Sequence, residues 1–96
     1  MVAYVILTRQ QTTDQSELDV YAKMAPAARE GHAMTALAFY GRHETLEGDP
    51  IEGAVVLEFP SIDAAKAWYT SPVYQEAVKH RFAGARYNAF IVEGVA

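Results

Sequence analysis

Residues 58–81 combine a strand end, a helix start and a helix break, and this combination narrows the folds open to the chain. A short apolar strand is predicted over residues 54–59 and is followed by a proline-containing turn. Ser61 is a favourable N-cap for the helix that comes next. The Ser71-Pro72 step predicts that this helix stops and a second one begins, because proline suits the first turn of a helix and not its interior.

The first half of the chain shows a similar strand and helix. In a strand over residues 2–8, the side chains that point to one face and those that point to the other are both apolar. This pattern predicts a strand covered on both faces. A polar loop is expected over residues 10–13. Asp14 followed by Glu17 has the spacing of a capping box, and apolar residues then recur at helical intervals. Pro26 lies inside this pattern and predicts a kink or a restart of the helix.

Two more strands, over residues 33–42 and 85–92, complete the order β-α-β-β-α-β in a single domain of residues 1–96. This order is typical of the α+β, ferredoxin-like fold with a four-stranded antiparallel sheet. Its two helices cover one face of the sheet, although the first and last strands are apolar on both. A second copy of the chain is the simplest cover for the other face, so we expect a two-fold dimeric α/β barrel, that is, a homodimer.

Composition excludes several classes of function. The net charge of −4 argues against binding to nucleic acid, which requires a basic surface. No run of 18 apolar residues exists, so no membrane span is expected, and the N-terminus resembles a strand rather than a signal peptide. The absence of cysteine excludes disulfides and thiol catalysis and fits a cytoplasmic protein. We expect no cofactor and no metal site, because no metal-binding or phosphate-binding motif is present.

Five short motifs lie along the chain: LEGD at 46–49, EFPS at 58–61, AWY-x-SP-x-Y at 67–74, Arg81, and VEG at 92–94. With these motifs the chain resembles, nearly end to end, the family known as domain of unknown function 1330. That family lies within the dimeric α/β-barrel superfamily. Two stretches depart from the family pattern. Residues 31–33 replace a usual glycine pair, and residues 40–43 form a more polar strand end.

The resemblance implies a ferredoxin-like fold and a homodimer, and it implies no particular reaction, because the family has no settled activity. Relatives in the wider superfamily include cofactor-independent monooxygenases, dehydrochlorinase-like and lactone-isomerising enzymes, haem-degrading enzymes and stress-response proteins. The two departing stretches are the places where a function specific to this chain would lie.

Polar aromatic residues are the first candidates for a site. Tyrosine hydroxyls that gather at one cavity can bind an aromatic or carboxylate ligand. The alternative is that each ring packs in the core or at the subunit interface with its hydroxyl satisfied. Trp68 and Tyr69 share a helical stripe and are both expected to be buried. The candidate tyrosines are Tyr21, Tyr40, Tyr69, Tyr74 and Tyr87.

Arg81 is the candidate anion-binding group, because it shares the apolar helical stripe of Tyr74 and a buried guanidinium needs a partner. A carboxylate or phosphate of a ligand would suit its planar fork. The alternative is a structural ion pair, either with the partner chain or with an acidic residue of its own chain. The acidic residues considered are Glu47, Asp49 and Glu58.

His43 is the candidate general base, because it ends a strand and two nearby carboxylates, Glu44 and Glu47, could orient it. The alternative is a solvated loop residue. His32 and His80 are expected near the surface.

The sequence therefore predicts a homodimer that binds a small acidic or aromatic molecule between its sheet and helices. The alternative is a cofactor-independent lyase, isomerase or monooxygenase that uses His43 or a tyrosine together with Arg81. Tyr69 joins His43 as a candidate catalytic residue. Ser71 is expected chiefly as a helix cap. The candidate ligand-binding residues are Arg81, Tyr74, Tyr40, Tyr21 and Ser71.

Overall fold

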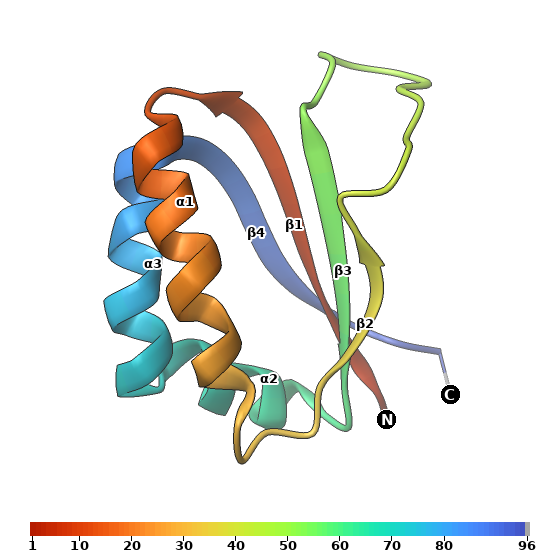
Figure 1. The fold of residues 1–96 in the computed structure, drawn as a ribbon. Helices are drawn as coiled ribbons and strands as arrows, with labels where there is room; N and C mark the ends of the chain where they lie inside the picture. The colour runs from red at the N-terminus through yellow and green to blue at the C-terminus, as the bar shows by residue number, and fades with distance from the viewer. Residues whose placement is uncertain (96) are drawn as a thin grey trace.

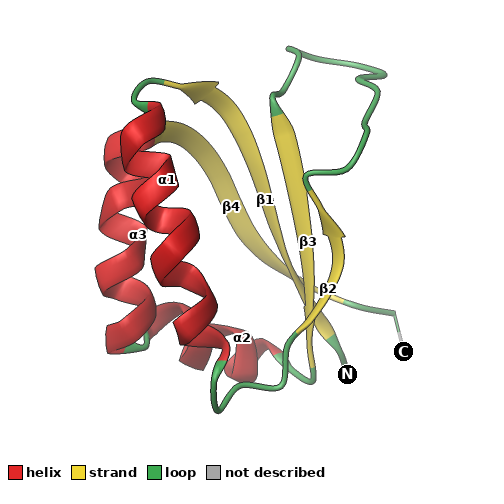
Figure 2. Ribbon diagram, in the orientation of Figure 1, coloured by secondary structure: helices red, strands yellow, loops and turns green. Residues whose placement is uncertain are grey.

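The structure, a computed structural model, describes residues 1–95 and forms a sheet with helices packed on one face (Figures 1 and 2). The strands are β1 (Ala3–Thr12), β2 (Thr35–Phe39), β3 (Gly53–Phe59) and β4 (Ala85–Glu93). The helices are α1 (Gln15–Met24), the 3-10 helix η1 (Ala25–Arg29), α2 (Ile62–Thr70) and α3 (Pro72–Gly84). None of the helices in this part of the chain has the length and apolar character needed to cross a membrane.

The four strands form one sheet in the order β2-β3-β1-β4, and each neighbouring pair is antiparallel. Strand β3 lies between β1 and β2, and β1 lies between β3 and β4, so the two βαβ units interleave. This confirms the predicted ferredoxin-like βαββαβ fold with a four-stranded antiparallel sheet.

Polar side chains cap the helices where the sequence predicted helix starts. Asp14 accepts a hydrogen bond from the backbone N–H of Ser16 at 3.0 Å, and Ser61 accepts one from the third residue of α2 at 3.0 Å. The capping box predicted at Asp14 is only half formed. Glu17 does not reach back to the cap, because its Oε2 lies 2.6 Å from Nδ1 of His80 on α3.

Both predicted interruptions of the helices are confirmed. Pro26 lies in the first turn of η1, directly after α1 ends. Pro72 opens α3, and Ser71 is both the C-cap of α2 and the N-cap of α3. Proline is tolerated at these positions because the first turn of a helix needs no backbone donor there.

Two predicted strand boundaries are wrong. Strand β1 continues to Thr12, where the sequence predicted a loop over residues 10–13, because Thr12 pairs with Ala85 beyond an irregularity in the β1–β4 register. Strand β2 is shorter than the predicted range 33–42. It ends at Phe39, because the next residue has a left-handed backbone conformation.

The core lies between the sheet and the helical layer. Alternate residues of β1, including Val5 and Leu7, face the helices and are each 3% exposed. Trp68 is buried against Phe59, with ring centroids 5.4 Å apart, which confirms its predicted burial. Tyr69 is only partly buried, contrary to expectation, because it lies beside Trp68 at the edge of the core cluster.

The opposite face of the sheet has no helix over it (Figure 1). On this face Ile6 pairs with Phe90 and Tyr4 pairs with Val92 across the β1–β4 ladder. Phe90 is 53% exposed and Val92 is 45% exposed in the single chain. We call this surface the open sheet face. Its apolar character is the one that the sequence predicted for the first and last strands.

Candidate functional site

A cavity of about 440 Å³ lies between the sheet and the α1–η1 side of the helical layer. Much of its wall is apolar: Leu7, Val55 and Leu57 come from the sheet, and Ala22 and Pro26 come from the helices. Its volume falls within the range of small-molecule binding sites. The polar side chains that reach this cavity therefore define the candidate site.

Four tyrosines form two hydroxyl pairs at the cavity, and we call Tyr21, Tyr40, Tyr74 and Tyr87 the tyrosine cluster. The hydroxyls of Tyr21 and Tyr74 lie 2.8 Å apart and join α1 to α3. The hydroxyls of Tyr40 and Tyr87 lie 2.5 Å apart and join the end of β2 to β4. Tyr21, Tyr40 and Tyr87 line the cavity, whereas Tyr74 is fully buried behind it.

Tyr40 is held in a strained position. Its φ of 54° lies in the left-handed region, which costs a residue with a side chain on the order of 1–2 kcal/mol. Its ring lies against Gly53 of β3, where a Cβ atom would approach the Tyr40 Cδ1 to 2.6 Å. The backbone N–H of Tyr40 donates to the carbonyl of Ala54 at 2.9 Å. Glycine at position 53 thus provides the space that lets the Tyr40 ring reach the cavity.

Arg81 lies within the tyrosine cluster and is only 2% exposed. Its guanidinium carbon is 4.7 Å from the ring centroid of Tyr87, 5.9 Å from that of Tyr21 and 5.4 Å from that of Phe82. Within residues 1–95 it forms no ion pair, and its Nε is buried without a hydrogen-bond acceptor. An arginine in this state is stabilised by aromatic faces instead of by a carboxylate.

The structural ion pair considered for Arg81 is not formed within the described part of its own chain. Glu58 alternates with the buried Leu57 and Phe59, so it belongs to the open sheet face. The loop that carries Glu47 and Asp49 is fully exposed. None of these three acidic residues forms an ion pair with Arg81 among the described residues.

Burial raises the pKa of Tyr21, Tyr40 and Tyr74 above the ordinary value of a tyrosine. In all three, the positive charge of Arg81 acts in the opposite direction and lowers the pKa. Because burial has the larger effect, these hydroxyls stay protonated near neutral pH. Tyr21 and Tyr40, which line the cavity, can donate a hydrogen bond to an oxygen atom of a ligand, and the nearby positive charge of Arg81 favours an oxygen with full or partial negative charge.

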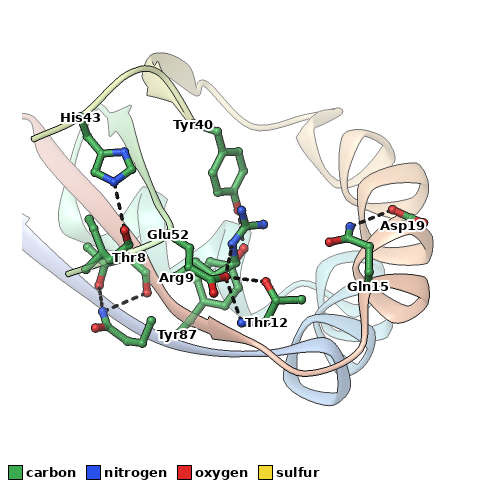
Figure 3. Close-up of polar contacts among 11 residues, drawn as sticks. Thr8, Arg9, Thr12, Gln15, Asp19, Tyr40, His43, Glu52 and Tyr87 are labelled. Atoms are coloured by element: carbon green, nitrogen blue, oxygen red, sulfur yellow. Dashed lines mark hydrogen bonds and ion pairs between the residues drawn. The ribbon is translucent and has the colours of Figure 1, made fainter. Parts of the chain in front are cut away.

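Arg9 lines the cavity, unlike Arg81, and it is paired (Figure 3). Its Nε lies 3.4 Å from Oε1 of Glu52, and its guanidinium carbon lies 5.1 Å from the ring centroid of Tyr40. The same Glu52 oxygen accepts hydrogen bonds from the backbone and the hydroxyl of Thr12, at 3.0 and 2.6 Å. Glu52 thus offsets the charge of Arg9 and fixes its position.

Helix α1 and η1 supply the polar groups on the helical side of the cavity. Gln15 donates to Asp19 at 3.0 Å, and both side chains line the cavity (Figure 3). Arg29, at the end of η1, also lines it and makes one long hydrogen bond, 3.5 Å, to the carbonyl of Met34. Among the described residues Arg29 forms no ion pair.

Three predicted site residues, His43, Ser71 and Tyr69, belong neither to the wall of this cavity nor to the tyrosine cluster around Arg81. His43 is exposed, and its Nε2 lies 3.0 Å from the carbonyl oxygen of Ile51, so neither nearby glutamate orients it (Figure 3). Ser71 donates to the carbonyl of Trp68 at 2.7 Å and serves as a helix cap. Tyr69 lines a separate, smaller cavity of about 240 Å³. The functional roles predicted for these residues stay predictions.

His80 and Glu17 form a second polar contact, outside the cavity. The pair joins α1 to α3 at 2.6 Å between Nδ1 and Oε2, and the two side chains are 35% and 34% exposed. The described residues contain no group of three or more His, Asp or Glu side chains placed to hold a metal ion.

Sequence reasoning missed Arg9, Arg29 and Asp19 as site residues. One signal was present for Arg9, which lies two residues after Leu7 and so shares its helix-covered strand face. Arg29 and Asp19 resemble ordinary surface residues in the sequence, because their place at the cavity depends on how α1 and η1 pack on the sheet.

Comparison with known proteins places this fold in a class of ferredoxin-like proteins. The chain belongs to the DUF1330 family, described as a domain of unknown function, whose pattern matches residues 2–95. This confirms the family predicted from the sequence motifs. The chain matches no protein among curated, characterised sequences.

Solved structures of similar fold come from several bacteria. A protein of unknown function from Rhodopseudomonas palustris superposes with a TM-score of 0.78 at 19% identity, covering 99% of this chain and 83% of the other. A dimeric ferredoxin-like protein of unknown function from Bacteroides fragilis gives 0.63 at 17%, covering 97% and 96%. The cofactor-independent oxygenase SnoaB from Streptomyces nogalater gives 0.59 at 11%, covering 99% and 93%. At these identities the likeness concerns the fold alone.

Proposed function

We propose that the protein binds a small acidic or aromatic molecule in the 440 Å³ cavity between its sheet and helices. The observation that carries the proposal is Arg81, a buried cation without an anionic partner among the described residues, set among hydroxyls that line the cavity. Removing a charge from water is costly unless a compensating partner is supplied. A ligand oxygen held by the tyrosine hydroxyls, with Arg81 behind them, would add a negatively polarised partner to the aromatic faces that already surround the guanidinium.

The apolar part of the cavity supports an aromatic body for the ligand. Leu57, Met34 and the indole of Trp68 line it together with small alanine side chains. A flat ring can bury its faces against these groups while an oxygen substituent reaches Tyr40 and Tyr87. Small-molecule sites commonly combine such an apolar wall with a few convergent polar groups.

Thermal unfolding in the presence of phenols and small carboxylates tests this proposal. A ligand at a hundred times its Kd stabilises the folded state by about 2.7 kcal/mol, which raises the Tm by several degrees in a domain of this size. Ala36→Phe should abolish the rise, because Ala36 lines the cavity and a ring there would fill it. Ala67→Phe, at an exposed position of α2, is the matched control. Equal shifts in both variants would contradict binding in this cavity.

We also propose that the protein is a homodimer in which two open sheet faces pack together. The proposal is supported by the exposed apolar side chains on that face and by the dimeric protein from Bacteroides fragilis with the same fold. Val92→Asp, on the open sheet face, should give a monomer in sedimentation experiments. Val73→Asp, equally exposed on α3, should leave the dimer intact. A monomeric unmodified protein at micromolar concentration would refute this assembly.

A cofactor-independent enzyme is the second candidate function, and the strained backbone of Tyr40 favours it. Residues held in costly conformations cluster at active sites. A tyrosine hydroxyl would donate to a substrate oxygen while Arg81 stabilises the negative charge that develops on it. NMR tests this activity by monitoring deuterium exchange at the carbon atom next to the carbonyl group of a small carbonyl-containing substrate. Loss of exchange in Tyr40→Phe would assign the role to the tyrosine, and loss in His43→Ala alone would assign it to the histidine.

A further inference from the structure

The cavity has two polar ends that differ in charge. At one end lie Tyr40 and Tyr87, with Arg81 behind them and Arg9 beside them. At the other end Arg29 lies at the far end of η1, the segment that continues α1. Helix α1 contains 10 residues and therefore spans about 15 Å. Because η1 directly follows α1, Arg29 lies beyond the C-terminal end of this helix, whereas Gln15 lies at its N-terminal end.

Two carboxylates lie at or near the cavity, and both have partners other than Arg29. Glu52 is paired with Arg9, and Asp19 is the carboxylate that α1 contributes to the cavity wall, where it accepts a hydrogen bond from Gln15. Arg29 has no such partner among the described residues, and its one hydrogen bond is to a backbone carbonyl at 3.5 Å.

Resting on the proposed function, we infer that the ligand is an elongated aromatic acid with an oxygen substituent opposite its carboxylate. Arg29 holds the carboxylate, because its guanidinium fork has no ion pair among the described residues and is exposed, so the anion keeps part of its hydration. The hydrogen-bonded hydroxyl pair of Tyr40 and Tyr87 holds the oxygen at the other end, which is phenolic or carbonyl in character: one hydroxyl donates to the ligand and the other donates to its partner in the pair. The apolar wall between the two ends contacts the ring.

This assignment makes Arg29 a specificity-determining residue that selects acids over neutral phenols. A charge-assisted hydrogen bond is stronger than one between neutral groups, so its loss lowers affinity by about tenfold or more. The loss applies only to ligands that carry the carboxylate. The hydroxyl of Tyr87 acts at the opposite end, so its loss should affect only ligands with the distal oxygen.

Titration calorimetry with three probes tests the inference: 4-hydroxycinnamate, cinnamate and 4-ethylphenol. Arg29→Gln should weaken both acids about tenfold and leave 4-ethylphenol unchanged. Tyr87→Phe should weaken 4-hydroxycinnamate and 4-ethylphenol and leave cinnamate nearly unchanged. Arg42→Gln, in the exposed loop after β2, is the matched control. Circular dichroism checks that each variant is folded.

The outcomes separate this inference from the proposed function. If the acids bind the unmodified protein and Arg29→Gln binds them equally well, Arg29 does not hold the carboxylate and the inference is overturned while the binding site stands. If Arg29→Gln weakens 4-ethylphenol as much as the acids, the arginine supports the cavity in general and the inference is also overturned. If no probe binds the unmodified protein, the inference and the proposed aromatic ligand both fail.

Discussion

Replacing Arg81 by methionine should leave the stability of the protein nearly unchanged. Burying a guanidinium costs several kcal/mol, and in most proteins a carboxylate offsets that cost. Here Arg81 is 2% exposed, and three aromatic rings at 4.7 to 5.9 Å surround it instead. Each such contact contributes about 0.5–2 kcal/mol, so together they roughly balance the desolvation of the charge.

Methionine keeps most of the volume of arginine and removes the charge. We therefore expect Arg81→Met to change the free energy of unfolding by less than about 1 kcal/mol, because a desolvation cost and a compensating attraction are lost together. Arg81→Ala should cost about 2–5 kcal/mol, because it leaves a cavity among the rings. Binding of 4-hydroxycinnamate should weaken in both variants.

Urea unfolding at a fixed protein concentration measures these differences, and the fixed concentration matters because a dimer is stabilised by mass action. Arg86→Met, at an exposed position of β4, is the control for removing an arginine charge. A loss of about 3–5 kcal/mol in Arg81→Met is the cost of breaking a buried ion pair, and it would refute the reasoning. It would show that an acidic group, such as one from the partner subunit, meets Arg81 in the assembled protein.

Three further predictions concern the packing around the site. Trp68→Ala should lower the free energy of unfolding by about 3–5 kcal/mol, and a loss below about 1 kcal/mol would contradict its burial. Gly53→Ala should cost about 1–3 kcal/mol and weaken ligand binding, because the new methyl group displaces the Tyr40 ring, whereas Gly41→Ala meets no atom within 4 Å. Because burial raises the pKa of three tyrosines in the folded state, their contribution to stability is complete below the unfolded value of 10.0 and is lost as the pH rises above it. Phenolate absorbance should therefore rise together with alkaline unfolding, and Tyr21→Phe should make that pH dependence less steep.

The fold was predictable because its signals are local. The N-cap at Ser61 and the helix restart at Pro72 depend on neighbouring residues, and both are confirmed. The end of β1 was not predictable in this way, because Thr12 belongs to the strand through its pairing with Ala85, far along the chain. A polar segment such as residues 10–13 resembles a loop until its distant partner strand is known.

The hydrogen-bond partners of polar side chains were not predictable from neighbouring residues either. His43 lies next to acidic residues in the sequence, but its hydrogen-bond partner is the backbone of Ile51. Glu17 fits a capping box by spacing, but its partner is His80, 63 residues away. A short side chain can meet only groups that the fold brings within a few ångströms, and sequence neighbours in an extended loop often point in different directions.

Arg81 shows which part of a site a sequence can predict. Its burial followed from helical periodicity, because it shares a stripe with Tyr74 on α3, and the structure confirms that burial. The interaction partner of Arg81 could not be predicted in this way, because periodicity indicates which face of the helix a residue lies on and not which groups pack against that face. Of the acidic residues considered as partners, Glu58 lies on the open sheet face and Glu47 and Asp49 lie in the exposed loop, and none pairs with Arg81 among the described residues. The cation is therefore left among aromatic rings beside a cavity, and this arrangement is the observation that supports the proposed ligand with an oxygen acceptor.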